Sequence, residues 1–137
     1  MKTSSDKKIK IYNIVNIIHD FENDQIQKLS IDLSLYFANK KIFWIFKENY
    51  LPKKNITEFI INISKENNYL NIIILKKDQN PKVLKFIKEV MKNFGKKIII
   101  ITTSNKKNLS DESIFYCKVN NLETDIKKKI INVINQI

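Results

Sequence analysis

The chain has 137 residues and a single cysteine, which suits one domain with its own core and excludes an internal disulfide bond or a cysteine-based metal site. Its formal net charge is +11, but all 25 basic residues are lysine, whereas arginine is the residue expected in a nucleic-acid groove. Together 27 Ile, 25 Lys and 18 Asn account for 70 residues, a composition that indicates A+T-biased codons. No apolar run reaches the length of a membrane span and residues 1–6 lack the apolar core of a signal peptide, so we expect a cytoplasmic protein.

The first patterned segment, from Lys8 to Phe21, has two interpretations. Its start, Ile9 to Ile14, suits a strand. Its apolar residues also fit one face of a helix: Ile11, Ile14, Val15, Ile18 and Phe21. Periodicity alone does not separate the two.

Residues 25–46 are ambiguous in the same way. Ile31, Leu33, Leu35 and Phe37 alternate with polar residues, as in a half-buried strand, and a turn at 38–41 would join this strand to a buried one at 42–46. The alternative is a helix with Ile26, Leu29, Leu33, Tyr36 and Phe37 on one face, which leaves Ile31 and Leu35 facing water. We favour the hairpin, at residues 30–46.

The next predicted element is a helix that begins near a capping-box pattern. Pro52 closes the loop before it, and Asn55 and Glu58 have the capping-box spacing. Its apolar face consists of Ile56, Phe59, Ile60 and Ile63.

Residues 71–103 predict the centre of the fold. Two runs of β-branched residues, at 71–75 and 97–102, suggest strands buried on both faces. Between them Asn80, Pro81 and Gly95 suit the cap, the first position and the C′ position of a helix. This is a βαβ unit.

The remaining elements complete an α/β pattern. Residues 114–119 read as a strand, and Asn120 or Asn121 can cap a final helix whose inward residues are Ile126, Ile130, Val133 or Ile134, and Ile137. Alternating strands and helices predict a single-domain three-layer α/β sandwich with a mostly parallel, mixed sheet.

The sequence contains no recognisable catalytic, cofactor-binding or metal-binding motif. A single glycine, Gly95, cannot build a phosphate-binding loop. His19 lies among carboxylates at 20–24, which we interpret as a solvated acidic turn, and Cys117 lies in an apolar strand where a thiol is inert. We therefore predict a protein that is not an enzyme and binds no cofactor.

Lysines follow the predicted strands. If the strands are parallel, these side chains gather at the carboxyl edge, where open α/β sheets bind ligands. The proposed basic rim consists of Lys53, Lys54, Lys76, Lys77, Lys106 and Lys107, with Lys47 and Lys118 nearby. Such a rim could contact an acidic partner or a nucleic-acid backbone.

The order of elements resembles the receiver domain of two-component signalling. Thr102 matches its threonine after the fourth strand and Lys118 its lysine after the fifth. Where that family has its phospho-accepting carboxylate, this chain has Leu75, Lys76 and Lys77, with Asp78 later, and the acidic pair after the first strand has no clear counterpart. The resemblance implies a degenerate receiver-like signalling or interaction domain.

The element order also resembles the psi subunit of bacterial DNA polymerase III. The matching segments are an apolar start (14–21), an alternating strand (30–37), a buried strand and loop (42–52), a helix (56–63), a strand (70–75), and a late strand with a closing helix (114–137). The resemblance implies a non-catalytic adaptor of the replication machinery that bridges the clamp-loader collar to a chi-type partner. Residues 1–24 would be the partner-binding segment, with contacts through Ile14, Ile17, Ile18 and Phe21, and residues 25–137 the globular domain.

We take the adaptor as the first expectation and the receiver-like domain as the alternative. A strand at 30–37 paired with 42–46 would favour the adaptor, and a helix at 30–37 would favour the receiver-like fold.

Overall fold

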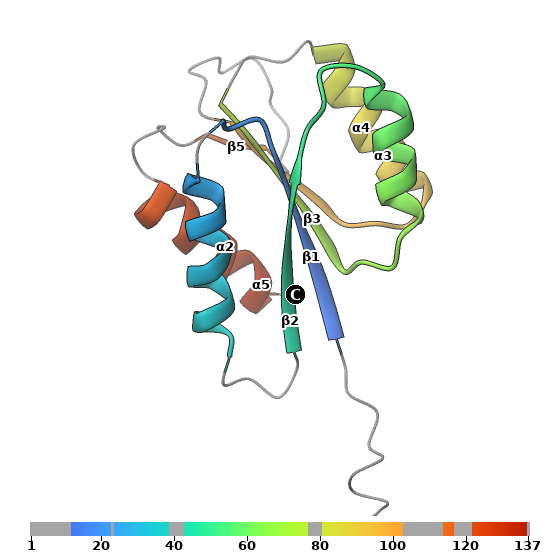
Figure 1. The fold of residues 1–137 in the computed structure, drawn as a ribbon. Helices are drawn as coiled ribbons and strands as arrows, with labels where there is room; N and C mark the ends of the chain where they lie inside the picture. The colour runs from blue at the N-terminus through green and yellow to red at the C-terminus, as the bar shows by residue number, and fades with distance from the viewer. Residues whose placement is uncertain are drawn as a thin grey trace, which may run out of the picture.

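The computed structural model describes residues 12–22, 24–38, 43–76, 81–102, 114–116 and 122–136. Strands and helices alternate along the described chain as far as residue 102 (Figure 1). In order they are β1 (Tyr12–His19), α2 (Gln25–Tyr36), β2 (Phe43–Tyr50), α3 (Ile56–Lys65), β3 (Leu70–Leu75), α4 (Pro81–Asn93), β4 (Ile98–Thr102), β5 (Ile114–Tyr116), a π-helical turn (Leu122–Ile126) and α5 (Lys127–Gln136). None of the helices in the described ranges is long and apolar enough to cross a membrane.

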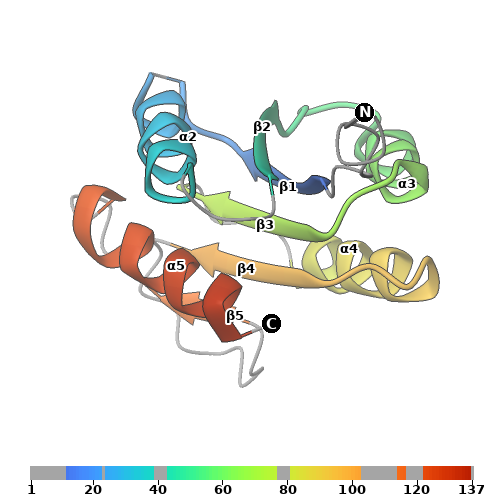
Figure 2. The same ribbon diagram turned by 90° about the horizontal axis from the view of Figure 1, so that it is seen from below.

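The five strands form one sheet in the order β2-β1-β3-β4-β5, and every pair of neighbours is parallel. Figure 2 shows α2 and α5 on one face of this sheet and α3 and α4 on the other. The predicted three-layer α/β sandwich is therefore confirmed, although the sheet in the described ranges is wholly parallel rather than mixed. The order is that of flavodoxin-like doubly wound folds.

Residues 25–36 form a helix, so the predicted hairpin at 30–46 is wrong. Ile26, Leu29 and Leu33 are buried, while Ile31 and Leu35 are 52% and 68% exposed. The physical reason lies in β1 and β2, which are parallel neighbours. Parallel strands cannot be joined by a tight turn, and a helical crossover between them is the usual solution.

The segment from Lys8 to Phe21 contributes the inner strand β1. Side chains from Val15 to Phe21 are buried. Because β1 lies between β2 and β3, helices cover both of its faces, and most of its residues are apolar. A nearly continuous apolar run of this kind also matches the spacing of a helical face.

The central βαβ unit is confirmed. Pro81 is the first residue of α4, and Gly95 follows its end with a φ of +70°. The Gly95 N–H donates to the Lys92 carbonyl at 2.9 Å and the Lys96 N–H to the Met91 carbonyl at 2.8 Å, which is a Schellman motif.

Two other predicted helix starts differ in detail. Asn55 stands at the N-cap of α3, as expected, but it has a left-handed backbone (φ 59°) and its side chain makes no capping hydrogen bond. The final helix begins with the π-helical turn, and its buried side chains are Ile126, Ile130 and Ile134. Asn80, Asn120 and Asn121 lie outside the described residues.

A chain of asparagines interrupts the apolar core on the α3 side of the sheet. Asn16 Nδ2 donates to Asn71 Oδ1 at 3.1 Å, and Asn49 Nδ2 donates to Asn16 Oδ1 at 3.3 Å. Asn71 Nδ2 donates to Asn68 Oδ1 at 2.9 Å and to the Lys97 carbonyl at 3.2 Å. These amides link β2, β1 and β3 through their side chains.

Candidate functional site at the carboxyl edge of the sheet

The strand order reverses at β1, which places a topological switch point between the carboxyl ends of β1 and β3. The chain leaves β1 toward β2 on one side and continues from β3 toward β4 and β5 on the other. Ligands of open α/β sheets bind outside this point. His19 and Asp20 stand at the end of β1, and Lys76 follows β3, at the upper end of the sheet in Figure 1.

Both nitrogens of the His19 ring are engaged. The Phe21 N–H donates to Nδ1 at 3.1 Å, and Nε2 lies 3.0 Å from Glu48 Oε2. A neutral imidazole with its proton on Nε2 satisfies both contacts. The ring, from a residue only 3% exposed, also meets Tyr50 edge to face at 5.5 Å between centroids. His19 is thus a closed structural link between β1 and β2, without a free nitrogen to act as a base.

Burial lowers the pKa of His19 below its ordinary value of 6.5. The Glu48 carboxylate, through its charge and hydrogen bond, and the charge of Asp20 act in the opposite direction. Desolvation of the imidazolium is the larger effect. Protonation would also place a hydrogen on Nδ1, where the Phe21 N–H already points.

We expect the free energy of unfolding to fall as the pH drops below about 6.5, the pKa of histidine in an unfolded chain. Because the folded-state pKa is lower, the unfolded state binds the proton first, so the contribution of neutral His19 is fully present above 6.5 and is lost through the folded-state pKa. Urea denaturation at pH 7.5, 6.5 and 5.5 measures this. The His19→Gln variant should lose less stability over the same interval, and equal losses in the two proteins would contradict the assignment.

Asp20 ties the two strands at the switch point together. Its Oδ1 accepts the Lys76 N–H at 2.6 Å, and the residue is 6% exposed.

The predicted solvated acidic turn is therefore wrong for His19 and Asp20, which are buried and hydrogen-bonded, and right for Glu22 and Asp24, which are exposed. Asp20 is also an acidic residue directly after the first strand, a counterpart that the receiver comparison did not identify. The sequence signal for this site was the polar pair His19 and Asp20, which directly follows the apolar run of β1.

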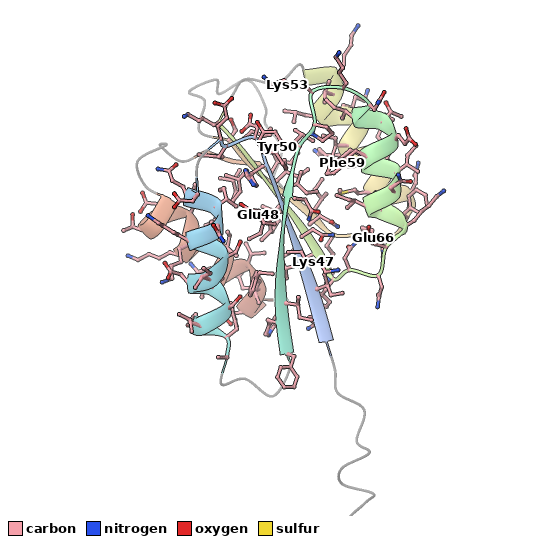
Figure 3. The ribbon with its side chains drawn as sticks, viewed as in Figure 1. Lys47, Glu48, Tyr50, Lys53, Phe59 and Glu66 are labelled. Atoms are coloured by element: carbon pink, nitrogen blue, oxygen red, sulfur yellow. The ribbon has the colours of Figure 1, made fainter. Side chains whose placement is uncertain are left out.

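The structure places part of the proposed basic rim at this edge. Lys53 and Lys54 are exposed in the loop after β2, and Lys76 is exposed after β3. Figure 3 shows Lys53 projecting from the upper end of the molecule, whereas Lys47 lies within β2. Lys77, Lys106, Lys107 and Lys118 lie outside the described residues, as does Cys117. Thr102, the residue matched to the receiver threonine, is buried at the end of β4.

The four proposed partner-binding residues belong to the body of the protein. Ile17 and Ile18 are 0% exposed on opposite faces of β1, Phe21 is 1% exposed, and Ile14 is half-buried. An inner strand must bury both faces, so Ile17, Ile18 and Phe21 form the core rather than a docking surface. The division at residue 24 is corrected accordingly, because β1 is part of the sheet.

No group of three or more histidine, cysteine, aspartate or glutamate residues within the described ranges is arranged to hold a metal ion.

Comparisons with models of protein families, with curated proteins and with solved structures found no match to this chain.

Proposed function

We propose that this chain is a non-catalytic protein-interaction module with a receiver-like, flavodoxin-like fold. One observation carries the proposal: the polar side chains beside the β1/β3 switch point are already held by hydrogen bonds within the protein. Asp20 accepts the Lys76 N–H, and Glu48 accepts from His19. Groups committed in this way are not free to bind or transform a small ligand at the place where doubly wound folds do so.

The comparison with receivers supports an interaction role without phosphorylation. That resemblance implies clustered carboxylates that hold Mg²⁺ beside a phospho-accepting aspartate. Here the residue directly after β3 is Lys76, an exposed cationic residue where a carboxylate would be needed to hold a divalent cation. Of the carboxylates that a receiver would need, only Asp20 stands at this edge of the sheet within the described residues.

The test is binding of beryllofluoride with Mg²⁺, which mimics an aspartyl phosphate. We expect no change in the thermal unfolding temperature and no shift of backbone amide resonances for residues 19–21 and 75–76. Saturable stabilisation would overturn the proposal. The Asp78→Asn variant provides the control, because loss of such stabilisation in this variant would identify Asp78 as a phospho-acceptor.

The bridging role in a clamp-loader assembly stays a second proposal that rests on resemblance. The segments matched at 42–52, 56–63 and 70–75 do contain β2, α3 and β3. The strand expected at 30–37 is instead α2, which favours the receiver-like alternative. Binding of the full chain to purified collar and chi-type subunits tests this role. Deleting residues 1–24 does not, because it removes β1 from the middle of the sheet.

A further inference from the structure

The outer edge of β2 is the most exposed apolar strand surface in the described part of the chain. β2 is an eight-residue edge strand, and within the described sheet it pairs with β1 alone. Phe43, Ile45 and Tyr50 are 51%, 37% and 43% exposed. Edge strands are commonly protected by charge, proline or short length, because their outer backbone groups can pair with another chain. Lys47 is the one lysine in this strand.

The two faces of β2 differ in what covers them. On the α2 side, Trp44 and Phe46 pack against the core, and both rings lie near the Phe37 ring, at 5.4 and 5.9 Å between centroids. On the α3 side, Phe43, Ile45 and Lys47 are all exposed. Side chains of an added strand would lie beside Phe43 and Ile45 on this second face and beside Trp44 and Phe46 on the first.

The chemistry of the edge changes along its length. Residues 43–46 are all apolar, whereas Lys47 and then Lys53 and Lys54 are exposed cations. Glu48 keeps its negative charge, but it lies on the opposite face of β2 from Lys47, where it accepts a hydrogen bond from His19. In Figure 3 Lys47 lies on β2 and Lys53 lies beyond its upper end.

We propose that the β2 edge binds an extended segment of a partner protein as a sixth strand. The partner segment is apolar opposite 43–46 and carries carboxylates opposite Lys47 and Lys53, so in an antiparallel arrangement its acidic residues precede its apolar ones. Main-chain hydrogen bonds supply affinity in this mode and alternate side chains supply specificity. Charge favours an acidic partner over a second copy, because two copies would each bring a net charge of +11. This inference rests on the proposed function and names the class of partner.

The full chain can be titrated with a ten-residue synthetic peptide with glutamates in its first half and alternating valine and threonine in its second. Trp44, the only tryptophan, lies on β2 and reports binding by its fluorescence. We expect saturable binding that weakens about tenfold in Lys47→Glu, a loss of roughly one charge-pair contact. Ile45→Lys, which adds a charge to the edge, should weaken binding by a similar or larger factor. The matched control, Lys85→Glu on α4, makes the same change in net charge at an exposed site and should bind like the parent.

A second peptide, N-methylated at every backbone nitrogen so that neither of its edges can donate, separates strand pairing from charge attraction. It keeps every carboxylate but cannot form the ladder, so its binding should be lost. Equal binding of the two peptides, equal weakening in Lys85→Glu and Lys47→Glu, or β2-mediated dimers of the chain in sedimentation would each overturn the inference. Beryllofluoride binding reports on the carboxyl edge instead, so failure of the proposed function and failure of this inference are distinguished.

Discussion

Replacing Asn71 with leucine is expected to lower the free energy of unfolding by about 3 kcal/mol, although the two side chains are similar in size. Asn71 is 0% exposed and stands at the centre of the asparagine chain. Its loss leaves Asn16 Nδ2 without the oxygen it donates to and Asn68 Oδ1 without its donor. The Lys97 carbonyl loses one of two donors and keeps the backbone N–H of residue 71. A buried polar group stripped of its partner costs about 1–3 kcal/mol, and Asn16 is only 1% exposed.

Urea denaturation followed by far-ultraviolet circular dichroism measures this change. The control is Asn62→Leu, the same substitution at an exposed position of α3, which should alter stability by less than about 0.5 kcal/mol. The double variant Asn16→Leu/Asn71→Leu should cost less than the sum of the single variants, because removing both partners leaves no donor stranded between them. Additive losses would show that the contact between Asn16 and Asn71 contributes no coupling.

The central βαβ unit could be predicted because its signals are local. Pro81 and Gly95 mark the ends of α4 through backbone constraints that act on those residues alone. The runs at β3 and β4 are apolar throughout because both faces are covered, and no alternative period competes with that pattern.

Residues 25–37 could not be predicted in the same way, because Leu33 fits both a strand alternation and a helical face. The choice depends on β1 and β2 being parallel neighbours, which is a property of the whole sheet. The same dependence on long-range contacts explains why the hydrogen bonds at the carboxyl edge were not predicted. Asp20 bonds a residue 56 positions away, and His19 meets Glu48 on another strand, so neither contact is visible in local sequence.

Phe21 illustrates how an apolar residue near the start of a chain can suggest a docking site while serving the core. It is 1% exposed and packs in one cluster with residues of β1, α2, β3, β4 and α5. It also donates its N–H to His19, which holds the turn after β1 in place. A partner-binding residue would be accessible, and its truncation would leave the fold unchanged.

Phe21→Ala is therefore expected to cost about 4 kcal/mol of stability, the range for emptying a phenylalanine site in a core. Small domains have about 5–15 kcal/mol in total, so this variant should unfold at a much lower urea concentration, with the slope of the transition unchanged. Phe94→Ala, which removes the same atoms where the residue is 42% exposed, should cost less than about 1 kcal/mol. If the two variants were equally stable, Phe21 would not be a core residue, and the start of the chain would again be a candidate for partner binding.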